Sequence, residues 1–193
     1  MRLFRVGIVA MVGVCVCVGA AGEKRAIDTE HSHLMVHVGK SGAFSGFGHA
    51  HDITAPIARG EVENSKPLSV SFDVNAAAMK VVDQGTSDSD KAQVQQVMLG
   101  ADVLDVAHYP QIHFASESVE VIGDGHWRVH GQLTLHGQTH PVELETRLER
   151  GHYRGTATIQ QTTFGITPIR VGGGTIKVKD EVQIEYDIVL AGQ

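Results

Sequence analysis

Apolar and polar residues alternate along much of the chain, most clearly in the segment 127–145, WRVHGQLTLHGQTHPVELE. From Trp127 to Leu135 the large apolar residues fall on odd positions and polar residues lie between them. This period of two is typical of a strand with one buried face. Gly137 interrupts the alternation, which resumes at Val142. The segment therefore predicts an antiparallel hairpin with one apolar and one wet face.

Three further segments, residues 33–38, 70–74 and 182–190, show the same alternation and predict strands with one buried face. Between Gln111 and Val121 the apolar residues move from even to odd positions across Ser116 to Ser118, without a turn signal. A change of phase inside a strand predicts a β-bulge or bend, which barrels need in order to close.

One segment, Ser87 to Leu99, has a different pattern. It begins with Ser and Asp, continues with helix-forming residues, and places apolar residues at spacings of three and four. We expect a short amphipathic helix here, ended by Gly100. About eight strands and one helix, joined by short turns, are compatible with two folds, an up-and-down barrel and a sandwich.

The first residues have the order of a secretory signal. Arg2 and Arg5 precede an apolar run from Val6 to Val18, and small residues follow up to Gly22. The run is shorter than the roughly 20 apolar residues that a membrane span needs. We therefore expect a signal peptide at 1–22, a single β domain at 23–193, periplasmic localisation, and no stable membrane insertion after cleavage.

The charge and the cysteine content limit the binding partners and the covalent cross-links that we expect. The formal net charge is -6, and loss of the leader would make it more negative, which argues against nucleic acid and anionic membrane surfaces as partners. Cys15 and Cys17 both lie in the leader, so no disulfide is expected in the mature chain. A homodimer is compatible with the sequence.

The histidines suggest a metal site as an alternative function. Pairs spaced two apart on a strand point the same way and can bind one cation, here zinc or copper. The candidate ligands are His31, His33, His49 and His51. The competing interpretation is polar histidines on a solvated face.

Catalytic motifs are absent from the sequence. The mature chain has no cysteine, and no Gly-x-Ser-x-Gly string occurs. Asp102 and Asp105 lie three positions apart in an expected loop. In loops, aspartates cap helices or stabilise turns far more often than they catalyse reactions. We expect no enzyme activity and no cofactor.

The enclosed apolar face is the remaining candidate site. The interior of an eight-stranded barrel either fills with its own side chains or holds one small ligand. Gly131, Gly155 and Ala157 fall on inward positions and would leave room. By strand phase, the residues expected to line the interior are Val36, Val38, Phe72, Val74, Ile112, Phe114, Trp127, Leu133, Leu135, Leu144, Phe164, Ile184 and Tyr186.

Four motifs in order resemble the YceI-like lipid- or polyisoprenoid-binding proteins of the bacterial periplasm. The first is Ile27-Asp28 followed by His31-Ser32, and the second is Asp102 and Asp105 followed by Tyr109-Pro110. The third and most distinctive is GQLTLHGQTHPVEL. The fourth is Phe164-Gly165-Ile166 with Asp180-Glu181-Val182. The resemblance covers nearly the whole mature chain.

The resemblance implies an all-β fold, an eight-stranded antiparallel lipocalin-like barrel with one short amphipathic helix. It also implies binding, transport or sequestration of an amphiphile with an isoprenoid or acyl tail in the barrel interior, without enzyme activity.

Overall fold

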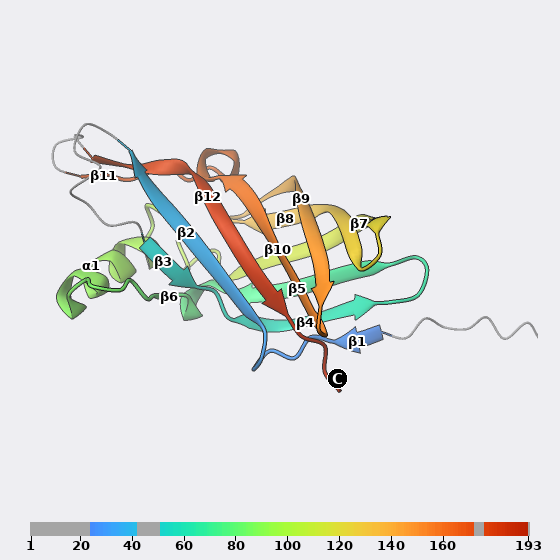
Figure 1. Ribbon diagram of the computed structural model, residues 1–193. Helices are drawn as coiled ribbons and strands as arrows, with labels where there is room; N and C mark the ends of the chain where they lie inside the picture. Colours follow the sequence, from blue (N-terminus) through green and yellow to red (C-terminus); the bar gives the residue numbers. More distant parts are fainter. Residues whose placement is uncertain (1–23, 42–50, 172–175, 193) are drawn as a thin grey trace, which may run out of the picture.

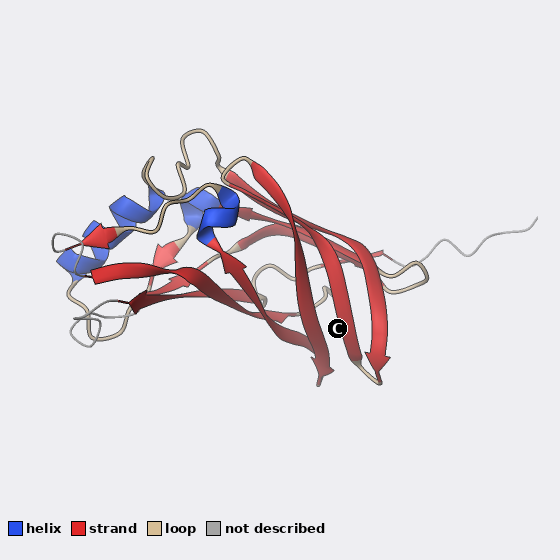
Figure 2. Cartoon of the chain, turned by 90° about the horizontal axis from the view of Figure 1, so that it is seen from above, coloured by secondary structure: helices blue, strands red, loops and turns tan. Residues whose placement is uncertain are grey.

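The computed structural model describes residues 24–41, 51–171 and 176–192, which form one curled antiparallel sheet (Figures 1 and 2). The strands are β1 (Lys24–Ala26), β2 (His33–Ser41), β3 (His51–Thr54), β4 (Ile57–Glu63), β5 (Ser69–Asn75), β6 (Lys80–Val81), β7 (Gln111–Gly123), β8 (His126–Leu135), β9 (Gln138–Glu149), β10 (His152–Gln160), β11 (Arg170–Val171) and β12 (Ile176–Ile188). The helices are α1 (Asp88–Leu99) and two 3₁₀ turns, η2 (Ala76–Ala78) and η3 (Gln161–Phe164). The expected signal peptide, residues 1–22, lies outside the described residues.

The strands pair in the order β1-β4-β5-β7-β8-β9-β10-β12-β2-β3-β6. Only Ala55 and Pro56 separate β3, which pairs with β2, from β4, which pairs with β5. The two edges of the curled sheet are therefore connected through one bent segment. The all-β, lipocalin-like class is confirmed, and the single sheet excludes the sandwich.

The predicted count of eight strands is too low. The described residues form twelve strands, of which eight have seven residues or more and four are short: β1, β3, β6 and β11. Each short strand has only two to four residues. Such a length is too short to show an alternation of apolar and polar residues, so the sequence did not predict these strands.

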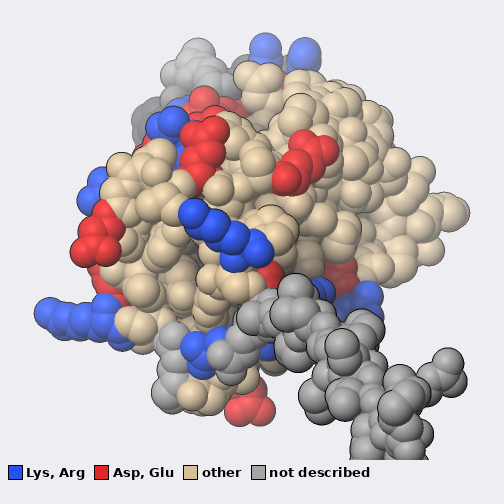
Figure 3. Space-filling view, turned by 90° about the vertical axis from the view of Figure 1, so that its right-hand side faces the viewer, with Lys and Arg blue, Asp and Glu red and all other residues tan. Residues whose placement is uncertain are grey.

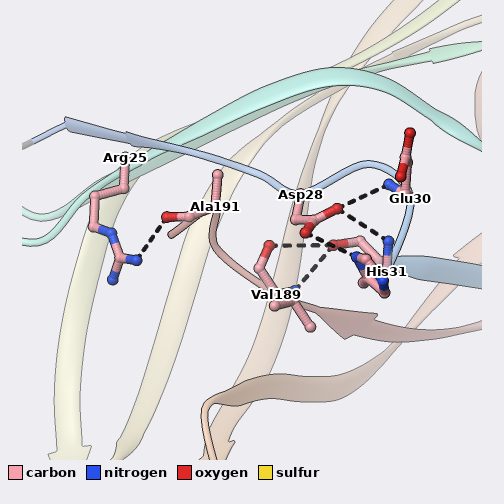
Figure 4. A network of polar contacts seen from close by, with 7 residues as sticks. Arg25, Asp28, Glu30, His31, Val189 and Ala191 are labelled. Atoms are coloured by element: carbon pink, nitrogen blue, oxygen red, sulfur yellow. Dashed lines mark hydrogen bonds and ion pairs between the residues drawn. The ribbon is translucent and has the colours of Figure 1, made fainter. Parts of the chain in front are cut away.

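The seam between the first and last strands is held by the residues of the first family-like motif (Figure 4). The Asp28 N–H donates to the Val189 carbonyl, and the Ala191 N–H donates to the Ala26 carbonyl, both at 2.9 Å. The buried Ser32 hydroxyl accepts from the Val189 N–H at 2.9 Å. The Asp28 carboxylate in turn accepts the N–H of His31 at 3.1 Å, which fixes the turn leading into β2.

The alternation and the phase change are both found where the sequence predicted them. Along β8, buried residues alternate with half-buried ones from Val129 to Leu135. The register of β7 against β8 shifts between Ser116 and Ser118, so the predicted bulge is confirmed. The bulge lets both halves of β7 direct their apolar residues inward.

The helix prediction is also confirmed, with one difference. The Ser87 side chain accepts from the Asp90 N–H at the helix start, and Gly100 follows the last turn. Only Met98 of α1 is buried, whereas Val97 is 42% exposed, so the apolar stripe is narrower than expected. Gln95 anchors the helix instead, because its amide bonds the backbone of Met79 and Val81 beside β6. Within the three described ranges, no helix is long and apolar enough to cross a bilayer.

Histidine–aspartate pairs join neighbouring strands on the outer surface. The imidazole of His113 on β7 lies 2.6 Å from the Asp73 carboxylate on β5, and Arg59 on β4 bonds the same carboxylate. His152 on β10 and Asp187 on β12 form an equivalent pair at 2.6 Å. Burial alone would raise the pKa of Asp73, but the hydrogen bonds from Arg59 and His113 outweigh it and hold this pKa below its ordinary value.

We expect Asp73→Asn to lower the free energy of unfolding by about 2 kcal/mol at pH 7, because a hydrogen bond to a charged group contributes about 1.5–3 kcal/mol. The native pKa of Asp73 is depressed, so this contribution is fully present above about pH 4, the ordinary Asp value, and is lost as the pH falls through the native value. Denaturant unfolding at several pH values measures it. Asp124→Asn, on an exposed turn, is the control; an equal loss in both variants would contradict the role of the β4–β5–β7 contact.

Candidate functional site

The inner face of the sheet encloses an apolar cavity of about 450 Å³. Side chains from all eight long strands reach it, together with Met98 of α1 and Leu104 of the following loop. Several wall residues, such as Val36, Phe72 and Ile184, are only half-buried although they point inward. Their remaining exposure is to the cavity itself, so the interior is not filled by the protein's own side chains.

The structure places twelve of the thirteen predicted interior residues in this wall. They are Val36, Val38, Phe72, Val74, Ile112, Phe114, Trp127, Leu133, Leu135, Leu144, Ile184 and Tyr186. Phe164 is not part of the wall. It is 1% exposed and packs edge-on against His140, with ring centroids 5.3 Å apart. Phe164 belongs to η3, where strand phase no longer says which way a side chain points.

Other wall residues were missed by the sequence reasoning. Val129, Val142, Ile159, Val182 and Ile188 share the phase of predicted neighbours and could have been found by extending the alternation. Wall residues from outside the long strands have no strand phase to predict them. They include Met79, Met98, Val103 and Leu104.

The inward glycines have a different role from the one expected. A Cβ on Gly131 would lie 2.6 Å from the Phe114 ring, and one on Gly155 would collide with the Tyr186 hydroxyl group. The missing side chains of these glycines therefore leave room for the aromatic rings of the neighbouring strands. They do not enlarge the cavity. The prediction that Gly131 and Gly155 leave room is wrong, whereas Ala157 does line the cavity.

Tyr186 brings one hydroxyl group to the apolar wall. This hydroxyl donates to the Glu145 carbonyl at 3.0 Å, and the Thr146 hydroxyl lies 2.8 Å away. Burial disfavours the ionised phenolate and raises the Tyr186 pKa. The group is thus neutral and engaged by the wall, which suits an apolar ligand beside it.

Met98 of α1 and the nearby Leu104 line one end of the cavity. The helices lie at one end of the curled sheet (Figure 2). Residues of three family-like motifs contact one another at this end. His136 and Gly137 form the two-residue β8–β9 turn with φ of 51° and 72°, values that glycine adopts readily. The ring of Tyr109 packs edge-on against His136 at 4.9 Å, and the Phe164 carbonyl lies 3.1 Å from the His136 Nδ1. The conspicuous GQTH turn therefore stabilises the covered end and does not line the cavity.

The opposite end is open. Among the described wall residues, the exposed ones are Asn64, Ser69 and Leu148. Asn64 and Ser69 flank the β4–β5 turn, and Leu148 lies near the end of β9, where its N–H donates to the Gly125 carbonyl of the β7–β8 turn at 2.8 Å. The polar residues Asn64 and Ser69 thus lie at the mouth, beside the apolar Leu148.

The four histidines of the metal hypothesis are not brought together. Val38 of β2 pairs with His51, five positions beyond His33, a separation of roughly 16 Å along a strand. The imidazole of His31 bonds Asp28, and that of His51 bonds the buried Asp83 at 2.6 Å. His49 lies outside the described residues. Across the described ranges, no group of three or more potential ligands could hold a metal ion.

A model of the YceI-like domain family matches residues 26–190. A UPF0312 protein of Vibrio cholerae is 29% identical over 205 aligned positions, covering 95% of this chain and 96% of the relative. A UPF0312 protein of Yersinia pestis is 40% identical over 108 positions, covering 49% of this chain and 56% of the relative.

Two solved structures share the fold. BcnA of Burkholderia cenocepacia superposes with a TM-score of 0.62 at 18% identity, covering 84% of this chain and 98% of the other. A polyisoprenoid binding domain from Saccharophagus degradans, implicated in plant cell wall breakdown, gives 0.53 at 11% identity, covering 87% and 97%. At these identities the likeness concerns the fold.

We expect Gly131→Ala to lower the free energy of unfolding by about 1–3 kcal/mol, because the added methyl group overpacks against the Phe114 ring and the Ala115 carbonyl. The double variant with Phe114→Leu recovers part of this loss. Gly123→Ala, whose methyl group would meet its nearest atom at 3.4 Å, is the control. Denaturant unfolding measures all three, and equal effects at the two glycines would contradict the assigned contact.

Proposed function

Because the chain belongs to the YceI-like domain family, we propose that it binds a lipid with an isoprenoid or acyl tail inside its cavity. The observation that carries the proposal is the wall itself, which is almost entirely apolar yet leaves about 450 Å³ unfilled. Transfer of a hydrocarbon chain from water into such a wall is favourable by about 0.8 kcal/mol for each buried methylene group.

The distribution of polar groups supports an amphiphile oriented with its tail inward. Asn64, Ser69 and Glu63 lie at the mouth, while Phe114, Leu133 and Ile166 lie deeper among buried residues. A head group at the mouth keeps its contact with water, so its desolvation is avoided. A polyisoprenoid binding domain from Saccharophagus degradans shares the fold, and this likeness supports a ligand of this kind.

Binding rather than catalysis fits the chemistry of the wall. Tyr186 and Thr146 bond one another and the Glu145 carbonyl. The Glu63 carboxylate accepts from the N–H and hydroxyl group of Ser65, at 3.0 and 2.7 Å, so it orders the turn. A general acid or base must lie within hydrogen-bond reach of the proton that it transfers. These polar groups are already committed to the protein.

We further propose that the protein acts in the periplasm after export. The support is the order of basic, apolar and small residues in 1–22. A chain that sequesters a lipid outside the cytoplasm keeps the tail shielded from water in a compartment between membranes.

We expect Ile184→Trp to reduce the amount of bound lipid about tenfold or more, because displacement of two methylene groups already costs about 1.6 kcal/mol. Ile184 lines the cavity between Val36 and Ala157 on the paired strands. Native mass spectrometry before and after organic extraction measures the bound hydrophobic mass.

Gln183→Trp, one position away on the outer face of β12, is the matched control and should keep the lipid. Thermal unfolding of both variants checks that they are folded. A wild-type protein that carries no extractable hydrophobic mass and takes up none from added prenol would overturn the proposed function.

For export, we expect the periplasmic fraction of an expressing bacterium to contain a chain that begins near residue 23. Mass measurement of the intact protein from that fraction identifies its first residue. Recovery of only the uncleaved chain, in the cytoplasm, would contradict the proposed localisation.

A further inference from the structure

Three side chains that can form hydrogen bonds lie in one row on the inner face of the sheet. Thr146 of β9 pairs with Trp127 of β8 on one side and with Gly155 of β10 on the other. Gly155 in turn pairs with Tyr186 of β12. Paired residues of an antiparallel sheet point to the same face, and Trp127, Thr146 and Tyr186 all line the cavity. Thr146 is two positions from Leu148, which is exposed at the mouth, so this polar row lies just inside the mouth.

The two hydroxyl groups of the polar row have already used their hydrogen atoms. Because Gly155 has no side chain, the Tyr186 ring crosses β10, and its hydroxyl group donates to the Glu145 carbonyl at 3.0 Å. The Thr146 hydroxyl group lies 2.8 Å from the Tyr186 oxygen and is therefore the donor between these two groups. Only oxygen lone pairs of Tyr186 and Thr146 remain available to a ligand, so the pair can accept hydrogen bonds but cannot donate them.

The cavity wall offers no positive charge to a ligand. None of its described residues is Lys, Arg or His, and the one charged residue among them is Glu63. The internal segments outside the described ranges, 42–50 and 172–175, contain no Lys or Arg in the sequence. Lys40 lies two positions beyond Val38 on β2, but it does not line the cavity, and the negative charge of the buried Asp83 acts on it.

The charges outside the mouth are of both signs. Lys66 and Arg150 lie on the β4–β5 and β9–β10 turns, Asp124 lies on the β7–β8 turn, and all three are exposed. Figure 3, which faces this end, shows basic and acidic side chains scattered over an otherwise uncharged surface. Charges in water are screened and attract one another only weakly. The rim of the mouth therefore does not select a charged head group.

We propose that the ligand has an uncharged head group that donates a hydrogen bond, as in a long-chain alcohol, and that the oxygen atoms of Tyr186 and Thr146 accept this bond. The proposal rests on the proposed function and narrows it to one class of ligand. A phosphate or carboxylate group at the polar row would lose its water, face oxygen lone pairs and find no cation in the described wall, which is costly. A hydroxyl group there exchanges a hydrogen bond to water for one to the protein.

The test compares three ligands that share one isoprenoid tail: farnesol, farnesyl phosphate and the hydrocarbon farnesene. Trp127 is the only tryptophan of the chain and belongs to the polar row, so its fluorescence reports binding to the mature protein. We expect farnesol to bind about tenfold or more tightly than farnesyl phosphate, because burial of an unpaired charge costs far more than burial of a hydrogen-bonded hydroxyl group. A head group that stayed in the water outside the wall would give the two ligands equal affinities.

Two substitutions test the polar row itself. Tyr186→Phe should lower the ratio of farnesol affinity to farnesene affinity about threefold to tenfold, the usual contribution of one hydrogen bond. Tyr109→Phe, outside the described wall, is its matched control and should keep the ratio. Thr146→Lys should raise the affinity for farnesyl phosphate about tenfold or more, because the wall then holds a cation. Gln183→Lys adds the same charge on the outer face of β12 and should not raise it.

The outcomes separate the head group from the tail. Equal affinities of the wild type for farnesol and farnesyl phosphate, or tighter binding of the phosphate, overturn the uncharged head group and leave the proposed function standing. An unchanged ratio in Tyr186→Phe overturns the role of the polar row. A wild-type protein that binds none of the three ligands overturns the proposed function itself. The wild-type comparison needs no substitution, so it decides the question even if a variant fails to fold.

Discussion

The structure depends on the contact that joins the first and last strands. A curled sheet leaves two rows of unpaired backbone groups unless its edges find partners. Here Asp28 and Ser32 bond Val189, at the end of β12, and the bent β3–β4 segment carries the sheet from β2 to β5. Because these contacts hold the wall in its curl, the inward faces of the eight long strands enclose a space instead of packing flat against another layer.

Most of the fold, and the position of the cavity, could be predicted from the sequence because the strands are half-buried. Alternation identified β8 and β12, and the phase change of β7 located its bulge. Strands of two to four residues, such as β6 and β11, are too short to show a period. The sharing of one barrel strand between β3 and β4 depends on the bend at Pro56, which no hydrophobic pattern reveals.

The cavity wall also contains residues that the sequence predicts and residues that it does not. Strand phase found twelve wall residues of the long strands, but it missed Met98 and Leu104, whose positions depend on how α1 docks against β6. It also misread Gly131, since a small residue facing inward can either open space or receive a neighbouring ring. The spacing of the histidines in the sequence suggested a metal site, but the register of β2 against β3 separates His33 from His51. The most conspicuous motif, around Gly137, supports the covered end.

The seam has a consequence for how the protein is made. Ser32 and Val189 are 157 positions apart, so their contact cannot form until nearly the whole chain is available. Contacts of such long sequence separation make folding slow, because much chain entropy is lost before they form. A nascent chain that still lacks β12 has an open sheet edge and an unsealed apolar interior. Until β12 is made, such a chain exposes apolar surface and an unpaired strand edge, which are the features that make incomplete chains prone to aggregation.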